Sequence, residues 1–241
     1  MMKEVEDDSK GIIIGGKNFN NLRYADDAAF VTDEEAELQN IITRVSDTCK
    51  EYGMEINTKK TKMMVISKTG NTTCNIVVNG RTLEQVTQYK YLGSWIMAGR
   101  CEREIKTRIG MAKDVFWKHK ELLKGNLNLR VKKQILRSNI FPVLRYACES
   151  WTLNNNLVNR INAFEQWCYR RLLCIKWTDK ISNKEVLFRI EEDKLCLFNS
   201  IQKQKLAFAG HVLRGSSGQR TLQILEGKFD STMAQGRHRR M

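Results

Sequence analysis

The sequence has little proline and histidine, and it has no long apolar run. Pro142 is the only proline among 241 residues, which argues against proline-rich linkers. No apolar run approaches the roughly 20 residues that span a bilayer, and the acidic start has no apolar segment of the kind that directs secretion. We therefore expect an intracellular protein, nuclear or cytoplasmic, with no membrane partner.

The seven cysteines are scattered along the chain and form no Cys-x-x-Cys pair. Several fall within apolar stretches, where a free cysteine behaves as a small hydrophobic residue. The three histidines likewise have no partner at a metal-ligand spacing. We therefore expect neither a disulfide framework nor a zinc site.

Positive charge is concentrated in the second part of the chain. Residues 1–100 contain 13 Lys and Arg against 14 Asp and Glu, whereas residues 101–241 contain 28 against 13. The whole net charge of +14 therefore comes from the second part. Such an asymmetry indicates a polyanionic partner, either nucleic acid or an anionic surface, or alternatively a solvated basic face on helices.

The pattern of the first hundred residues predicts mixed strands and one helix. We expect a hairpin around Gly15–Gly16, short strands on both sides of Asp26, and a helix from Asp33 to Tyr52. Thr32 or Asp33 would cap that helix, and Gly53 would end it. Further strands are expected at residues 63–66 and 89–96, with a type I′ turn at Asn79–Gly80 between two more.

After about residue 99 the pattern becomes helical. Helices are expected at residues 101–123, 129–140, 157–177 and 195–213, with a short helix capped by Ser182. The tail from Ser216 is expected to be disordered. The fold class is therefore α+β, with predicted domains at residues 1–99, 100–215 and 216–241.

Asp26 and Asp27 stand between short apolar strands, in the segment Arg-Tyr-Ala-Asp-Asp-Ala-Ala-Phe-Val. We expect them at the tight turn of a hairpin, where two adjacent carboxylates repel each other unless a cation neutralises them. Mg²⁺ prefers such oxygen ligands, together with phosphate oxygens. The alternative is a solvated turn, since aspartate is a common turn residue.

Two later blocks follow this segment in order: Gly-Met-Glu-Ile-Asn-Thr-Lys-Lys-Thr-Lys from Gly53, and Tyr-Lys-Tyr-Leu-Gly from Tyr89. Together the three blocks resemble the reverse transcriptases of non-LTR (LINE-type) retrotransposons, over about residues 11–96. The resemblance implies an incomplete palm, built of antiparallel strands and a helix, followed by a basic helical thumb.

The resemblance also implies roles for single residues. Asp26 and Asp27 match metal-binding aspartates that hold Mg²⁺, and Lys60 matches a lysine near the incoming triphosphate. Tyr91, Leu92 and Gly93 match a hairpin that supports the 3′ end of the primer, and Tyr24 is expected to contact nucleic acid as well. From composition alone, Lys60 would be an ordinary basic strand entry, and Tyr91–Gly93 strand and core residues.

One part of the family's pattern is not found. The polymerase needs a third aspartate on an earlier strand, and no acidic residue before Asp26 ends an apolar strand. We therefore expect a reverse transcriptase fragment with an incomplete Mg²⁺ site and little activity alone. RNA template and DNA primer are the expected partners, and dNTP only if the missing palm part is supplied. The alternatives are a non-catalytic nucleic-acid-binding module and a helical interaction protein.

Basic residues recur along the predicted helices and would contact phosphates. Nearby aromatic residues would either stack on unpaired bases or, as helical spacing favours, pack in the core. The candidate nucleic-acid-binding residues of this region are Lys113, Lys118, Lys120, Arg130, Lys132, Lys133, Arg170 and Arg171.

Overall fold

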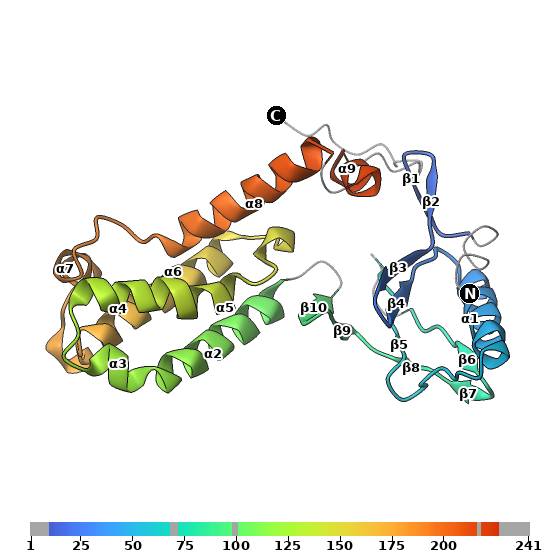
Figure 1. The fold of residues 1–241 in the computed structure, drawn as a ribbon, viewed down its shortest axis with the longest axis horizontal. Coiled ribbons are helices and arrows are strands. Elements are labelled where there is room, and N and C mark those ends of the chain that lie inside the picture. The colour runs from blue at the N-terminus through green and yellow to red at the C-terminus, as the bar shows by residue number, and fades with distance from the viewer. Residues whose placement is uncertain (1–9, 68–71, 98–100, 216–217, 227–241) are drawn as a thin grey trace. The chain divides into compact units, whose positions relative to one another are not determined.

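The computed structural model describes residues 10–67, 72–97, 101–215 and 218–226 (Figure 1). It combines helices with short, mostly antiparallel strand pairs, which confirms an α+β fold in general terms. The chain forms two compact units, which we call the hairpin unit (residues 1–89 and 211–241) and the helical unit (residues 90–210). None of the described helices is long and apolar enough to cross a membrane.

The described strands are short and form five separate pairs. Three pairs in the hairpin unit are antiparallel hairpins, β1–β2, β3–β4 and β6–β7, and β5 pairs with β8 in parallel. The strands are β1 (Ile12–Ile14), β2 (Lys17–Phe19), β3 (Asn21–Tyr24), β4 (Asp27–Phe30), β5 (Lys62–Met63), β6 (Val77–Val78), β7 (Arg81–Thr82), β8 (Glu84–Gln85), β9 (Gln88–Tyr91) and β10 (Ser94–Met97).

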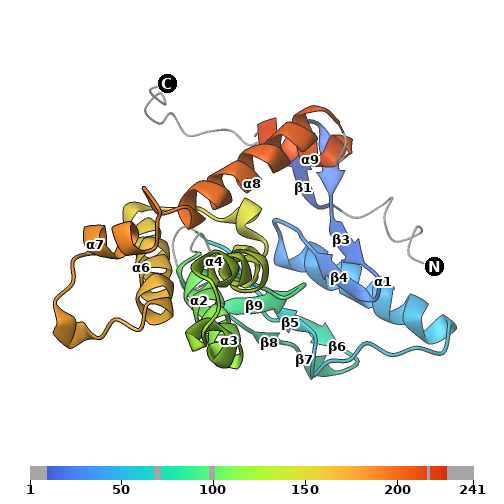
Figure 2. The ribbon, with the colours of Figure 1, turned by 60° about the vertical axis from the view of Figure 1, so that its left-hand side comes forward.

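Helix α1 (Glu35–Glu51) supplies most of the core of the hairpin unit. Figure 2 shows the β3–β4 hairpin beside this helix, and Phe30 of β4 packs against the buried Ile41 and Val45. The next residue of the same apolar stripe, Ile42, belongs to a second small cluster with Met63, Ile76, Val78 and Leu83. The amphipathic helix expected from the sequence is therefore present.

The two ends of α1 differ in how well the sequence predicts them. Gly53 has φ of +68°, its N–H donates to the Lys50 carbonyl, and the Met54 N–H donates to the Cys49 carbonyl. This is the expected glycine C-terminus with its pair of capping hydrogen bonds. The predicted N-cap is wrong: Glu34 occupies that position without a side-chain cap, and the Thr32 hydroxyl donates to the Glu34 carbonyl instead.

The helical unit contains most of the helices and three short helical turns. The helices are α2 (Glu102–Lys118), α3 (Lys120–Lys124), α4 (Leu129–Ile135), α5 (Phe141–Arg145), α6 (Asn155–Leu172), α7 (Asn183–Arg189) and α8 (Leu197–Leu213), whose last residues enter the hairpin unit. The turns are a π segment (Leu136–Ile140) and two 3₁₀ turns (Cys148–Ser150 and Trp177–Asp179).

Three helix predictions are wrong in detail. The helix expected at residues 101–123 is two helices that meet at His119. The helix expected to end near Pro142 is followed directly by α5. Pro142 lies in the first turn of α5, where N–H groups have no carbonyl partner within the helix, so its missing N–H costs no hydrogen bond. The helix expected at 157–177 ends at Leu172, after which Cys174 has φ of +56°.

The predicted tail also needs correction. Helix α9 (Gln219–Glu226) lies where a disordered segment was expected, and the Lys17 ammonium donates to the Gln219 side chain at 2.9 Å. Residues 216–217 and 227–241 are outside the described part of the chain. The predicted Ser182 cap is confirmed, since its hydroxyl accepts a hydrogen bond from the Glu185 N–H.

The core of the helical unit is continuous. It joins α2, α6 and the path from α4 to α5, and it contains twenty buried described residues. Glu165, which is fully buried, holds the start of α8: its carboxylate accepts from the N–H groups of Cys196 and Leu197 and from the Tyr169 hydroxyl. Burial and the nearby Glu165 raise the pKa of Tyr169, so this hydroxyl remains a donor.

Candidate functional site

The structure places Asp26 in the turn of the β3–β4 hairpin and Asp27 at the first position of β4. Tyr24 and Asp27 are directly opposite each other across the pair. All three residues are exposed, with Tyr24 at 66%. The hairpin expected around the two aspartates is therefore present, and its tip is open to solvent.

The backbone of this turn is unusual. Ala25 has φ of +53°, a conformation that costs a residue with a Cβ on the order of 1 kcal/mol or more. The turns of β1–β2 and β6–β7 place Gly15–Gly16 and Asn79–Gly80 at positive φ, which are ordinary residues for such turns. Ala25 is one of seven non-glycine described residues at positive φ, so its strain accompanies the two carboxylates but does not by itself single out this turn.

The two carboxylates suit a hard cation such as Mg²⁺ in the chemistry of their donor atoms. Neither carboxylate is engaged in an ion pair within the described residues. However, no group of three His, Cys, Asp or Glu side chains in the described part of the chain lies close enough to hold a metal. Asp26 and Asp27 could therefore supply some of the oxygen ligands of a Mg²⁺ ion, but not a complete set.

Lys60 lies in an exposed turn between α1 and β5. Asn57 fixes this turn, because its side-chain oxygen accepts from the N–H groups of Lys59 and Lys60 at 3.2 and 3.1 Å. Among the described residues, no hydrogen bond or ion pair joins Lys60 to Asp26 or Asp27. The structure thus places Lys60 in the hairpin unit but not in contact with the aspartates.

The segment around Tyr91 is a hairpin, as the resemblance implied, and the single strand that the pattern predicted at residues 89–96 is wrong. Strands β9 and β10 pair across a turn in which Leu92 and Gly93 have φ of +47° and +80°. The Tyr146 hydroxyl donates to the Leu92 carbonyl at 3.0 Å, and Arg108 donates to the Gly93 carbonyl at 2.6 Å. Side chains from the helical unit therefore fix the backbone of this turn.

A buried ion pair supports the same hairpin. Glu104 and Arg108 on α2 are 3% and 5% exposed, and their charged groups are 2.6 Å apart. Glu104 also accepts from the Trp95 N–H at 2.8 Å, and the Arg108 guanidinium lies 4.2 Å from the centre of the Tyr146 ring. Sequence reasoning missed these residues, although the Glu–Arg spacing of four on an amphipathic helix was a visible signal.

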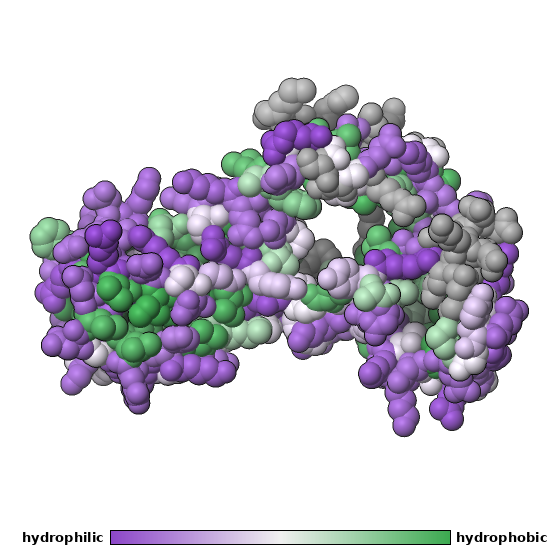
Figure 3. Space-filling view, viewed as in Figure 1, coloured by the Kyte–Doolittle hydropathy of each residue, from purple (hydrophilic) through white to green (hydrophobic). Residues whose placement is uncertain are grey.

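The predicted basic residues of the helical unit differ in what their side chains contact. Lys133 and Arg170 make internal contacts: Lys133 donates to the Ile190 carbonyl, and Arg170 donates to the Ile181 carbonyl and the Asn183 side chain. Lys118, Lys120 and Arg130 are exposed at helix ends, and Lys132 is half-buried. Purple, hydrophilic residues cover much of the visible face of this unit in Figure 3.

Lys113 and Arg171 meet at an aromatic cluster. Trp167 packs against Phe116 and Trp117 at ring-centre distances of 5.0 and 5.9 Å. The Lys113 ammonium lies 5.2 Å from the Trp167 ring, and the Arg171 guanidinium lies 5.8 Å from it. Most of these aromatic surfaces are therefore in contact with the core, as helical spacing favoured.

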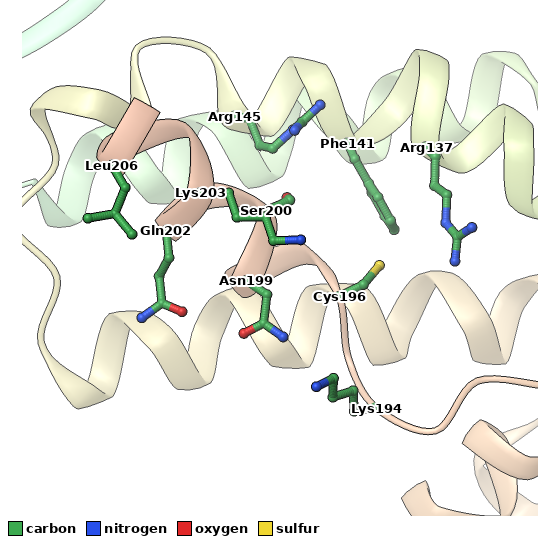
Figure 4. A pocket seen from close by; sticks show the side chains of 10 residues that line it. All are labelled: Arg137, Phe141, Arg145, Lys194, Cys196, Asn199, Ser200, Gln202, Lys203 and Leu206. Carbon is green, nitrogen blue, oxygen red and sulfur yellow. The ribbon is translucent and has the colours of Figure 1, made fainter. Parts of the chain in front are cut away.

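A basic cavity of about 740 Å³ lies between the α4–α5 path and α8. Figure 4 shows Arg137 and Arg145 on one side of it and Lys203 on the other. The Arg145 Nε is buried and has no hydrogen-bond partner in the described part of the chain, whereas Arg137 pairs with Glu192. This cavity, which sequence reasoning missed, combines unpaired donors with positive charge and suits an anion such as a phosphate.

Cys196 is the cysteine in the lining of this cavity. Burial, together with the nearby Glu165 carboxylate, raises the pKa of this thiol. A neutral thiol is a weak nucleophile, because the thiolate is the reactive form. Binding of an anion is therefore the chemistry that the cavity supports.

Residues 1–96 match the family model described as reverse transcriptase (RNA-dependent DNA polymerase). The chain is also 28% identical over 219 residues to a Caenorhabditis elegans protein described as uncharacterized and transposon-derived. That match covers 88% of this chain and 78% of the other protein. No solved structure matches the chain. Similarity to reverse transcriptases and to a transposon-derived protein is therefore confirmed.

Proposed function

We propose that this chain is part of a retrotransposon reverse transcriptase, of the non-LTR type, that carries a metal-binding hairpin and a nucleic-acid-binding helical region. The observation that carries the proposal is the solvent-open turn with Asp26 and Asp27, which lies inside residues 1–96 matched to the reverse transcriptase family. In such an enzyme, bound Mg²⁺ stabilises charge on the transferring nucleotidyl group.

In this proposal Asp26 and Asp27 hold part of the Mg²⁺ coordination shell. Lys60 lies near the triphosphate and steadies the charge of departing pyrophosphate. Tyr91, Leu92 and Gly93 support the primer, and the anchoring of their turn by Arg108 and Tyr146 keeps it in a fixed shape. Two carboxylates alone do not complete the site, so the 241 residues by themselves have little polymerase activity.

The helical unit binds the template and primer in this proposal. Its exposed Lys118, Lys120 and Arg130, and the cavity beside Arg145, offer positive charge to phosphates. A non-catalytic nucleic-acid-binding module is the second candidate, and the same cations support it. The two candidates differ only in whether Asp26 and Asp27 still serve a reaction.

Primer extension on an RNA template with Mg²⁺ tests the catalytic part of the proposal. The purified chain is expected to extend the primer weakly, and Asp26→Asn is expected to remove what activity there is. Robust Mg²⁺-dependent synthesis that Asp26→Asn abolishes would show that the site is complete and the claim of low activity wrong. Activity that Asp26→Asn leaves unchanged would remove the proposed metal role.

Salt dependence of RNA binding tests the second part. If about six phosphates are neutralised, the logarithm of the binding constant should fall against the logarithm of salt concentration with a slope of about −4 to −5. Binding should survive Asp26→Ala. A slope near zero would exclude the phosphate contacts.

A further inference from the structure

Trp177 is the most exposed of the large hydrophobic residues in the described part of the chain, at 91%. Trp151, in contrast, is 3% exposed, and Trp167 packs in the aromatic cluster. Tryptophan is highly buried on average, so an almost fully exposed indole on a protein surface indicates a binding role.

The loop that carries Trp177 is held by specific contacts. The Asp179 carboxylate accepts from the Lys176 N–H at 2.8 Å, which closes the 3₁₀ turn. Arg170 on α6 donates to the Ile181 carbonyl at 2.7 Å and to the Asn183 side chain at 2.9 Å. The indole is therefore presented to solvent by an ordered turn, rather than exposed because the loop lacks structure.

A cavity of about 590 Å³ opens beside this indole. It is lined only by apolar and basic residues, namely Trp167, Arg170, Arg171, Ile175, Lys176, Trp177, Lys180 and Ile181. Asp179, on the same turn, is the nearby acid, and its carboxylate accepts from Lys176 and Thr178. Among the described residues, no carboxylate pairs with the ammonium of Lys176 or Lys180.

We propose that this surface binds single-stranded nucleic acid, with an unpaired base stacked on Trp177 and the flanking phosphates held by Arg171, Lys176 and Lys180. The proposal rests on the proposed function, because it assumes that the helical unit binds nucleic acid. It adds a site at which base stacking, and not charge alone, contributes to affinity.

The combination of an aromatic face and cations favours this ligand over others. Every base has a flat π face that stacks on an indole, and its backbone brings a phosphate on each side. In a duplex the bases already stack on one another, so a single Trp reaches them only at an end. An acidic peptide would use the cations but would leave the indole without a flat partner.

Substitution of Trp177 tests the stacking. Trp177→Ala should weaken binding of single-stranded oligouridylate about 5- to 100-fold, whereas Trp177→Phe should keep most of the affinity. Phe188→Ala is the matched control, since Phe188 is 79% exposed in the same unit but does not line the cavity. Oligouridylate should also quench tryptophan fluorescence in the wild-type chain, and less so in Trp177→Ala.

Substitution of the two lysines tests the phosphate contacts. The double change Lys176→Ala with Lys180→Ala should reduce the magnitude of the slope of log binding constant against log salt concentration by about 1.4, for a single-stranded ligand. Lys184→Ala, an exposed lysine on α7 that does not line the cavity, should leave it unchanged.

The outcomes separate this inference from the proposed function. If the wild-type chain fails to bind oligouridylate at low salt, the proposed nucleic-acid binding is itself wrong. If the wild type binds and Trp177→Ala binds equally well, only the Trp177 site is overturned. Equal binding of polyglutamate, unaffected by Trp177→Ala, would also overturn it, because the surface would then recognise negative charge alone.

Discussion

The hairpin unit and the helical unit bury their apolar residues in different ways. The helical unit has one continuous core with twenty buried described residues, drawn from nearly all of its helices. The hairpin unit has two small clusters around α1, and each of its sheets contains two strands. Two-stranded sheets are marginally stable without further packing.

This difference indicates where the molecule opens first. Segments with few buried contacts and exposed backbone hydrogen bonds open at lower free energy than a continuous core. Asp26 and Asp27 lie in the less densely packed unit, whereas the Leu92–Gly93 turn is fixed by side chains of the helical unit. The β3–β4 and β9–β10 hairpins therefore differ in how their backbones are held.

The largest effect is expected from breaking the buried ion pair. Glu104→Ala should destabilise the helical unit by about 3–5 kcal/mol, because it leaves the Arg108 charge buried and unpaired. Denaturant unfolding followed by circular dichroism measures this change.

The exposed pair of Lys106 and Glu102 on the same helix is the control. Its charged groups are 2.7 Å apart and both side chains are about half exposed. Lys106→Ala should change the unfolding free energy by about 0.5 kcal/mol or less. Equal effects of the two substitutions would show that burial does not distinguish the pairs.

A smaller effect is expected in the rates at which buried cysteines of the two units are alkylated, since these rates report how often each unit opens. Cys49 in the hairpin unit, and Cys148 and Cys168 in the helical unit, are all buried. Burial raises the pKa of Cys148 to about 11 and also raises that of Cys168, so at pH 8 both are neutral thiols that react only after opening. Alkylation, followed by mass spectrometry, should be at least about tenfold faster at Cys49 than at Cys148 or Cys168.

Exposed Cys174 serves as the internal reference for this experiment and should react first. Burial raises the pKa of Cys148 to about 11, so up to pH 10 the folded chain keeps this thiol mostly neutral and its modification continues to report opening. Equal rates for Cys49 and Cys148 would indicate that the two units open together.

The smallest effect is expected at the Ala25 turn. Ala25→Gly should stabilise the hairpin unit by about 0.5–1 kcal/mol, because glycine adopts positive φ without a Cβ penalty. Hydrogen exchange of the β3–β4 and α1 amides measures this gain. Ala29→Gly, within β4, should instead reduce their protection. A loss of protection in Ala25→Gly would contradict the strain inferred for this turn.

Local signals allowed much of the fold to be predicted. The apolar stripe of α1, the Gly53 terminus and the Asn79–Gly80 turn depend on neighbouring residues, so the sequence reveals them. The apolar periodicity did not reveal that α2 and α3 meet at His119, or that Pro142 lies in the first turn of α5 rather than at the end of a helix. The same apolar stripe runs through both positions, so the pattern alone does not mark these boundaries.

Part of the candidate site was predictable, because that part also depends on neighbouring residues in the sequence. Asp26 and Asp27 form a local motif, and the structure places them at the expected turn. The cavity beside Arg145 forms between the α4–α5 path and α8, and the cavity beside Trp177 forms between α6 and the turn that follows it. Lys133 and Arg170 looked like exposed cations in the sequence but contact carbonyls of the loops around α7.

The anchoring of the β9–β10 turn has a consequence for where this chain can be divided. The reverse transcriptase match ends at residue 96, yet residues 90–96 belong structurally to the helical unit. A protein shortened at the edge of the match would deprive the Leu92 and Gly93 carbonyls of their donors on Tyr146 and Arg108. The matched range and the helical unit therefore overlap at residues 90–96. A division of the chain that preserves both must keep these residues together with the helical unit.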